Sequence, residues 1–200
     1  MAVGDRREGS SWDTRRDEIV DTAAKLFASQ GYDATGVAEL GDAVGLGRGA
    51  LYYYIESKEN LLALIHDRVI VEVLAAGEES VALGVPASDR LRALGRRLVN
   101  IIASYPDHVW VFLHEFRSLQ GQAAEDFRTS RRAFERAIER ILIDGVDAGE
   151  FEIANTRLAA LGWLGLHNYT YIWYHTGGPF TPDLIAENFA DIFIRGVKAR

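Results

Sequence analysis

Apolar residues recur every three or four positions through most of this 200-residue chain, which is the spacing of amphipathic helices. Three short segments show the pattern first, over residues 16–30, 37–44 and 48–55. Gly31 ends the first segment, because glycine accepts the left-handed backbone of a helix stop, and a glycine-marked turn at 44–47 separates the other two. No segment alternates convincingly as a strand does. The pattern therefore predicts an all-α protein that opens with three short helices.

Longer helical segments fill the rest of the chain. Ser57 is placed to cap a connector helix over 58–77, and a loop that contains glycine and proline is expected at 77–88. The later segments are bounded by residues that commonly cap or stop helices. These helices are expected over 88–105 with Ser88 as the cap, over 107–119, over 123–148 before Gly149, over 156–176 after Asn155, and from Pro182 onward after Thr181.

A short helix held beyond a tight turn by two supporting helices is the arrangement that enters a DNA major groove. The net charge of −7 argues against indiscriminate binding to phosphates, so DNA affinity must come from a few well-placed cations and helix N-termini. The absence of cysteine excludes disulfides and thiolate chemistry. No apolar run approaches the roughly 18 residues of a membrane span, and residues 1–11 lack a signal sequence. A cytoplasmic location is therefore expected.

Three motifs in order carry a family resemblance: GYDAT at 31–35, GLGRGALYYYI at 45–55 and SKE at 57–59. Together they resemble the DNA-binding signature of TetR-family repressors, with matching spacing over about 50 residues. The resemblance implies a homodimer that binds a palindromic operator on double-stranded DNA. It also implies that a small-molecule effector releases the protein from that operator.

The resemblance assigns DNA contacts to nine positions. Thr35 and Lys58 would touch phosphates, and the start of the third helix would meet base edges. Arg48 is the strongest candidate for reading a base, because a guanidinium bidentate to guanine provides about 1–3 kcal/mol of discrimination. Gly36 and Ala50 stand where relatives usually have hydroxyl residues, so a hydroxyl contact is not expected at either. The predicted set is Thr35, Gly36, Arg48, Gly49, Ala50, Tyr52, Tyr53, Tyr54 and Lys58.

Other chemistries fit the sequence less well. Residues 45–50 satisfy the loose G-x-G-x-x-A form of a dinucleotide-binding turn, but that motif needs a preceding buried strand and the preceding segment has helical spacing. His108 and His114 are the nearest approach to a metal site, yet six positions separate them on a predicted helix and they lie on different faces. There is no G-x-S-x-G elbow. We expect no enzyme activity, no cofactor and no metal.

The second half of the chain should hold the effector. Residues 108–117 are apolar nearly all round with polar groups interspersed, which suits a helix that is buried between others and lines a cavity. Aromatic residues of two later helices are expected across from it. The alternative is simply a well-packed aromatic core. The predicted ligand-binding residues are Tyr105, Trp110, Leu113, His114, Arg117, Phe134, Ile138, Trp163, Asn168 and Tyr171.

Residues 105–117, 166–174 and 178–179 also resemble the C-terminal type found in repressors of fatty-acid and steroid-ring degradation. That resemblance implies an acyl-CoA thioester as the effector. Three arginines within 128–132 have the helical spacing to meet CoA phosphates. They can equally pair with glutamates of the same helix on a solvated face.

Apolar stripes that include small residues mark the last two helices. A terminal helix needs only one covered face within its own chain. The additional apolar surface on these two helices therefore predicts a two-fold four-helix bundle between two chains. The predicted interface residues are Leu158, Leu161, Gly165, Tyr169, Phe189, Ile192 and Phe193.

The sequence thus predicts a disordered N-terminal arm at 1–12, a helix-turn-helix DNA-binding domain at 13–60, and a ligand-binding and dimerisation domain at 61–200. The predicted function is that of a TetR-type repressor released from its operator by a small, largely apolar effector. A helical dimeric adaptor or small-molecule-binding protein without a DNA role is the alternative.

Overall fold

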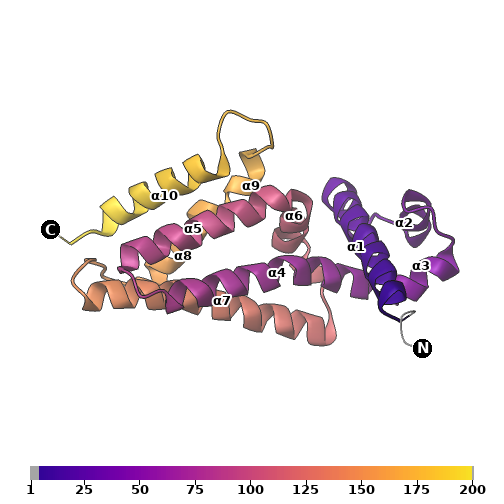
Figure 1. The fold of residues 1–200 in the computed structure, drawn as a ribbon, viewed down its shortest axis with the longest axis horizontal. Coiled ribbons are helices and arrows are strands. Elements are labelled where there is room, and N and C mark those ends of the chain that lie inside the picture. Colours follow the sequence, from indigo (N-terminus) through magenta and orange to yellow (C-terminus); the bar gives the residue numbers. More distant parts are fainter. Residues whose placement is uncertain (1–4, 200) are drawn as a thin grey trace. The chain divides into compact units, whose positions relative to one another are not determined.

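The computed structural model describes residues 5–199, and side chains from residue 11 onward. Within this part of the chain all regular elements are helices, apart from an isolated antiparallel bridge between Phe151 and Lys198. The helices form two compact units (Figure 1). The first contains the described residues up to Val69 together with Asp107–Glu125, and the second contains Ile70–Pro106 and the described residues from Asp126 onward. The predicted all-α class is confirmed.

The first unit is built on three helices whose apolar faces meet. Its core contains side chains that are almost completely buried, among them Phe27, Leu40, Leu51 and Ile55. The sequence spacing predicted these inward faces. Its elements are α1 (Asp5–Gln30), α2 (Val37–Ala43), α3 (Arg48–Ile55), the first part of α4 (Lys58–Ala82), α6 (Pro106–His114) and the 3-10 helix η1 (Phe116–Ser118).

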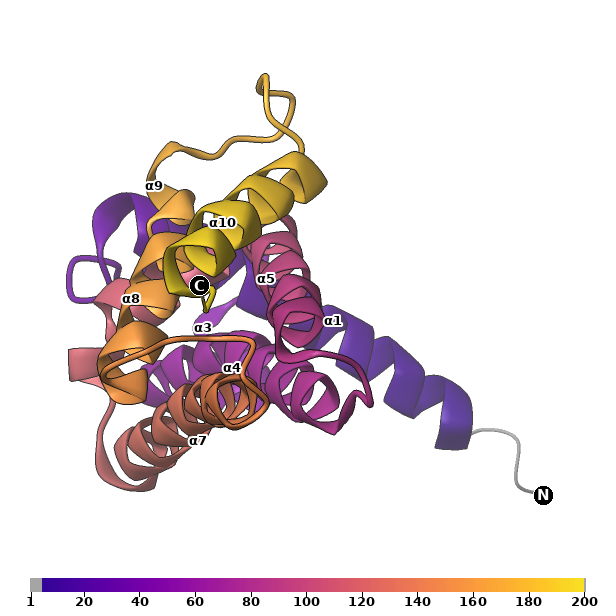
Figure 2. The ribbon, with the colours of Figure 1, turned by 90° about the vertical axis from the view of Figure 1, so that its left-hand side faces the viewer.

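The second unit is a helical bundle with an aromatic and aliphatic core. Figure 2 shows the later part of α4 beside α7, and α10 lying along α5. Trp163, Leu91, Leu94 and Ile138 are fully buried. Besides the later part of α4, its elements are α5 (Ala87–Ser104), most of α7 (Gly121–Asp147), α8 (Thr156–Asn168), α9 (Thr170–Trp173) and α10 (Pro182–Val197). None of the described helices combines the length and apolarity needed to cross a membrane.

The start of the chain differs from the prediction of a disordered arm at 1–12. Helix α1 already begins at Asp5, and only residues 1–4 of that arm lie outside the described residues. Trp12 stacks on Tyr54 of α3, with ring centroids 5.9 Å apart. This long-range contact joins the beginning of α1 to α3, and the spacing of apolar residues did not reveal it. The unit boundary at Val69 also lies beyond the predicted domain boundary at residue 60.

The predicted loop at 77–88 is mostly helix. Helix α4 continues through Gly77 to Ala82 because the glycine is buried against α7. A Cβ at Gly77 would lie 3.1 Å from the Phe134 ring and 3.3 Å from the Ala137 Cβ. The glycine therefore permits a close approach of two helices and does not end one. The loop shrinks to residues 83–86.

Ser88 does not cap α5, contrary to the prediction, since the helix starts one residue earlier at Ala87. The Glu150 carboxylate instead accepts the N–H groups of Ala87 at 2.9 Å and Ser88 at 3.2 Å, and the Ser88 hydroxyl at 3.0 Å. Burial raises the pKa of Glu150, but these hydrogen bonds and Arg90 outweigh burial and lower it overall. The cap of α5 thus comes from Glu150, three residues beyond the end of α7.

Three predicted caps are confirmed. At the start of α4 the Ser57 hydroxyl accepts the N–H of Asn60 at 2.9 Å. The Asn155 side chain accepts the N–H of Leu158 at 3.0 Å, and the Thr181 hydroxyl accepts that of Leu184 at 3.2 Å. Two predicted helices are shorter than expected: α6 ends at His114, five residues before the expected end at 119, and the segment 156–176 divides into α8 and α9 around Tyr169.

Candidate DNA-binding site and effector-binding body

The turn between α2 and α3 is fixed by two glycines. The N–H of Leu46 donates to the carbonyl of Gly41 at 2.8 Å, and a Cβ at Gly41 would lie only 2.6 Å from the Leu46 carbonyl oxygen. Gly45 has φ +68°, in the left-handed region that favours glycine. The turn backbone therefore passes directly over α2, and this sets the direction in which α3 leaves.

Helix α3 buries one face and exposes the other. Leu51 and Ile55 are fully buried, whereas Tyr53 is 70% exposed. The exposed residues of its first turn are Arg48, Gly49 and Ala50. Gly47 precedes α3 in extended conformation, and no side chain caps the helix. The first N–H groups of α3 have no acceptor within the helix, so they are available to an external anion.

The three tyrosines of α3 do not share one environment. Tyr52 and Tyr54 are half-buried, and Tyr53 is the exposed one. The Arg48 guanidinium lies 5.7 Å from the centre of the Tyr52 ring, which restrains the arginine beside the helix. Tyr53 meets Tyr54 edge-on at 5.3 Å. The aromatic run therefore forms a continuous surface around the exposed face of α3.

Lys58 at the start of α4 is held by Tyr32. Its Nζ donates to the Tyr32 carbonyl at 2.6 Å and lies 4.2 Å from the centre of the Tyr32 ring. Burial, then the charges of Glu59, Asp33 and Glu115, raise the pKa of Tyr32 to about 12. An ammonium group has three donors, so one bond to Tyr32 leaves capacity for a phosphate. The phosphate contact of Lys58 stays a prediction.

Thr35 is a correction to the predicted site. Its side chain is 1% exposed, and its hydroxyl donates to the Gly31 carbonyl at 2.9 Å. A buried, bonded hydroxyl cannot also reach a phosphate, so Thr35 stabilises the turn after α1 instead. Gly36 precedes α2 in extended conformation and provides no side-chain cap, as expected for a glycine at this position.

The predicted ligand-binding residues divide between the two units. Trp110, Leu113, His114 and Arg117 belong to the first unit, and the others belong to the second. His114 is exposed and stacks on Trp110 at 4.2 Å. In the second unit the predicted residues differ in burial: Phe134, Ile138 and Trp163 are buried, and Tyr105, Asn168 and Tyr171 are half-buried.

Three buried polar atoms on one side of α8 and α9 have no hydrogen-bond partner among the described residues. They are Trp163 Nε1, His167 Nε2 and Thr170 Oγ1, and all three residues are 0% exposed. Positions 163, 167 and 170 follow i, i+4, i+7 spacing, which places them on one helical face. Trp163 is among the ligand-binding residues predicted from the sequence, whereas His167 and Thr170 are not, although their spacing from Trp163 indicates them.

His167 is neutral, and its hydrogen bond defines which nitrogen carries the proton. Burial lowers the pKa of His167 to about 4. Its Nδ1 lies 2.9 Å from the Trp163 carbonyl oxygen. A carbonyl can only accept, so Nδ1 carries the hydrogen and Nε2 is an acceptor. The three unpaired groups therefore present a donor, an acceptor and a hydroxyl that does both.

The last helices expose most of the predicted dimer residues. Leu158, Leu161, Tyr169 and Ile192 are 40–65% exposed, and Gly165 is exposed as well. The predicted residues Phe189 and Phe193 are half-buried within the chain. One reason is that the Phe189 ring meets His167 edge-on at 5.6 Å and Trp173 at 6.3 Å.

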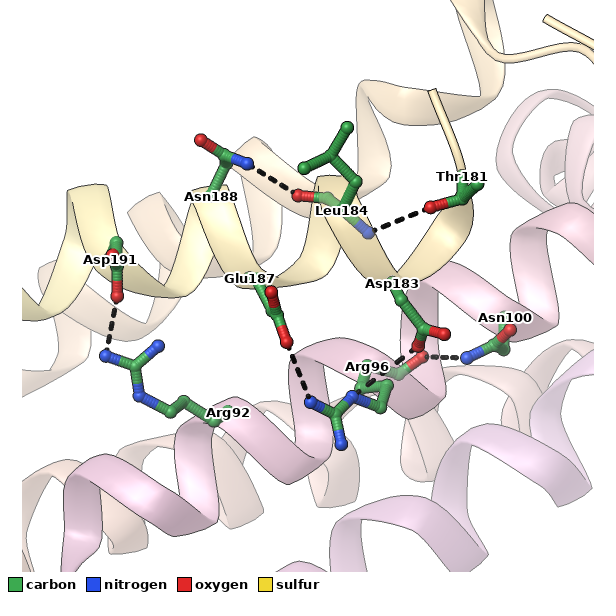
Figure 3. Close-up of polar contacts among 9 residues, drawn as sticks. All are labelled: Arg92, Arg96, Asn100, Thr181, Asp183, Leu184, Glu187, Asn188 and Asp191. Carbon is green, nitrogen blue, oxygen red and sulfur yellow. Dashed lines mark hydrogen bonds and ion pairs between the residues drawn. The ribbon is translucent and has the colours of Figure 1, made fainter. Parts of the chain in front are cut away.

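Ion pairs hold α10 along α5 (Figure 3). Arg92 contacts Asp191 at 2.6 Å, and Arg96 contacts Glu187 at 3.4 Å and Asp183 at 3.6 Å. The hydrogen bond and charge of Arg92 lower the pKa of Asp191. With α10 tied to α5, Ile192 remains exposed on another side of the helix.

Two family profiles match the chain. The profile described as "Bacterial regulatory proteins, tetR family" covers residues 19–65, and "Tetracyclin repressor-like, C-terminal domain" covers residues 84–197. The protein belongs to the TetR family. The resemblance inferred from the motifs at residues 31–59 is thereby confirmed. The first profile corresponds to the helix-turn-helix of this TetR-family regulator, and the second corresponds to its C-terminal helices.

Relatives of this TetR-family protein include transcriptional regulators named KstR2. The transcriptional repressor KstR2 of Rhodococcus jostii is 28% identical over 192 residues, which are 92% of either chain. The structure of the ketosteroid transcriptional regulator KstR2 of Mycobacterium tuberculosis matches with a TM-score of 0.87 at 22% identity, over 93% of this chain and 96% of that one. These relatives agree with the resemblance seen in the C-terminal body.

A third similar structure is that of AibR in complex with isovaleryl coenzyme A and operator DNA, with a TM-score of 0.79 at 23% identity, over 89% of this chain and 97% of that one. At this identity the match shows a common fold.

Among the described residues of the TetR-family chain, no three His, Cys, Asp or Glu side chains gather as a metal site would require.

Proposed function

We propose that this TetR-family protein is a repressor that binds a palindromic operator as a homodimer and is released by a small, largely apolar effector. The observation that carries the proposal is the division of α3 into a buried face, with Leu51 and Ile55, and an exposed face with Arg48 and Tyr53. A short helix presented in this way after a tight turn suits the major groove. If the protein were an adaptor without a DNA role, the exposed arginine and tyrosine of α3 would be unexplained.

The DNA contacts follow from exposure and charge. Arg48 would read a guanine, and the N–H groups of Gly49 and Ala50 would approach the backbone or base edges. Tyr53, with the partly exposed Tyr52 and Tyr54, would contact phosphates and thymine methyl groups. Lys58 would bind a phosphate from the start of α4, and the backbone of Gly36 would do so from the start of α2.

We assign the effector to the acyl-CoA thioester class, with the acyl group entering the second unit. The unpaired atoms of Trp163, His167 and Thr170 support a buried ligand, because a buried polar group without a partner costs about 1–3 kcal/mol. A neutral ligand group with an acceptor for the indole N–H and a donor for His167 Nε2 would satisfy them. Hydroxyl and amide groups can both accept and donate in this way, and AibR with isovaleryl coenzyme A provides a precedent in the same fold.

Release would work by a shift between two conformations. Helix α4 is continuous from Lys58 to Ala82 and belongs partly to each unit. An effector that favours one position of α4 in the second unit would change the separation of the two α3 helices of a dimer, which then no longer matches successive major grooves. No reaction is involved, and a cytoplasmic location fits this role.

The DNA role is tested by selecting duplexes from a randomised pool with the full-length protein. The expected result is a near-palindromic site whose half-sites are about one helical turn apart, or a multiple of that. In the Arg48→Ala variant, one position of each half-site should lose its preference. Failure of the unaltered protein to enrich any sequence would contradict a DNA-binding function.

The effector class is tested by thermal unfolding with isovaleryl-CoA, longer acyl-CoA thioesters and free CoA. A thioester that binds the folded state should raise the melting temperature in proportion to the logarithm of its concentration, and it should also release the protein from the selected duplex. Trp163→Phe, which removes the indole N–H and keeps an aromatic ring, should reduce the shift. A shift with free CoA alone would place recognition on the CoA portion.

A further inference from the structure

Two arginines of the DNA-binding domain, residues 13–60, have no carboxylate partner among the described residues, although acidic residues outnumber basic ones in the chain. Arg15 pairs with Glu18 at 2.7 Å and Arg68 with Asp17 at 3.3 Å. Arg16 and Arg48, in contrast, each lie over an aromatic ring. In a protein of net charge −7, a guanidinium kept apart from carboxylates is available to an external anion.

Arg16 is joined to the recognition helix by a chain of rings. Its guanidinium carbon lies 5.2 Å from the centre of the Trp12 ring. Trp12 stacks on Tyr54 at 5.9 Å with an interplanar angle of 27°, and Tyr54 meets the exposed Tyr53 edge-on at 5.3 Å. The aromatic surface of α3 therefore continues onto the first turns of α1 and reaches Arg16.

The guanidinium of Arg16 is held by the Trp12 ring, but its Nε–H has no hydrogen-bond acceptor. Its Nε is buried and has no hydrogen-bond partner, while the residue as a whole remains partly exposed. Contact with the Trp12 ring restricts the side chain, so binding an anion would cost less conformational entropy than for a free arginine. A planar guanidinium forms paired hydrogen bonds with phosphate oxygens.

We propose that Trp12 and Arg16 extend the DNA-contacting surface from α3 onto α1, with Arg16 binding one backbone phosphate in each half-site. The inference rests on the proposed DNA-binding function. A phosphate is favoured over a base because Arg16 belongs to α1, and in helix-turn-helix docking the helices outside the groove face the backbone. Trp12 acts as a positioning residue, since it holds the guanidinium beside α3.

The test uses the full-length protein and the duplex selected from a randomised pool. Arg16→Ala should weaken binding by about three- to tenfold and lower the slope of log affinity against log salt by about 1. Ethylation interference should lose one phosphate per half-site, and the selected sequence should stay the same. Arg16→Gln keeps the length without the charge and should give the same slope; it covers the case in which Arg16→Ala folds poorly.

Arg68→Ala is the matched control, because Arg68 lies in the same unit but is paired with Asp17; its slope should equal that of the unaltered protein. Trp12→Phe should retain most of the affinity and Trp12→Ala should not. An unchanged slope and interference pattern in folded Arg16→Gln would show that the stack is structural only and would overturn the inference. If the unaltered protein enriches no duplex, the proposed function itself fails, which is a different observation.

Discussion

Gly41 is the residue on which the geometry of the DNA-binding turn depends. An alanine Cβ would lie 2.6 Å from a backbone oxygen, which cannot rotate away as a side chain can. We predict that Gly41→Ala lowers the free energy of unfolding by about 1–3 kcal/mol, and that DNA binding falls further than stability does because the turn must move. Urea unfolding and binding to the selected duplex measure the two effects.

Gly49→Ala is the control for this substitution. A Cβ at Gly49 would meet nothing within 4 Å, and the residue lies inside α3 without a positive φ. Alanine favours helix over glycine by about 0.5–1 kcal/mol, so this variant should be as stable as the parent or more so. Equal stabilities for the two variants would show that the close approach at Gly41 does not constrain the turn.

Buried histidines make stability depend on pH. Burial lowers the pKa of both His66 and His167 from 6.5 to about 4. Between these values the unfolded chain binds protons that the folded chain does not, so stability is complete above pH 6.5 and is lost as the pH falls toward 4. We predict that the free energy of unfolding falls by about 2 kcal/mol per histidine between pH 7 and pH 5.

The His167→Gln variant isolates this effect. Glutamine keeps an N–H donor and does not titrate, so the loss between pH 7 and pH 5 should be smaller by the share of one histidine. The quantity to compare is the slope of the free energy of unfolding against pH, because the other groups titrate equally in both proteins. Urea unfolding at a series of pH values provides the measurement, and an identical pH dependence in both proteins would mean that His167 binds its proton equally well in the folded and the unfolded state.

At the scale of the elements, the start of α5 depends on a residue in the segment that follows α7. The Glu150 carboxylate holds two N–H groups and a hydroxyl at this start. We predict that Glu150→Ala destabilises the protein by about 1–2 kcal/mol, the usual range for a lost helix cap. Hydrogen exchange of the Ala87 and Ser88 amides should accelerate. Glu152→Ala, at an exposed neighbouring position, should leave both exchange rates unchanged.

The elements also show where sequence reasoning succeeds and where it fails. Thr181 and Asn155 were predicted as caps because a cap bonds to a residue three positions away. Glu150 and Ser88 are 62 positions apart, so no local pattern connects them. In the sequence Gly77 resembles a loop residue. Its place within a helix is explained by the close approach of Phe134 and Ala137 of α7.

The same division applies to the candidate site. The order of motifs from 31 to 59 indicated a projecting helix and its family, since these motifs are local. Thr35 was assigned to a phosphate by position in the motif, yet its hydroxyl is buried against Gly31. The roles of Trp12 and Arg16 depend on stacking between α1 and α3, which is a tertiary contact that the spacing of either segment does not contain.

At the scale of the whole molecule, DNA binding depends on two chains acting together. A single α3 reads only a few base pairs, and the chain is acidic overall, so one head gains little from nonspecific attraction to phosphates. Two heads joined in a dimer bind with the combined affinity of both half-sites. The exposed apolar residues of α8 and α10 are the surface that we expect to join them.

We predict that Leu161→Glu disrupts the dimer. Leu161 is 40% exposed on α8, and two-fold symmetry would bring the new charge into an apolar interface twice, where desolvation is costly. Sedimentation should show monomers at concentrations where the parent is dimeric. Affinity for the full palindrome should fall to that for one half-site. Val71→Glu places the same charge on an apolar residue that is 63% exposed on α4, and it should leave the mass unchanged. If Leu161→Glu remained dimeric and bound the palindrome normally, the dimer would have to form through a different surface.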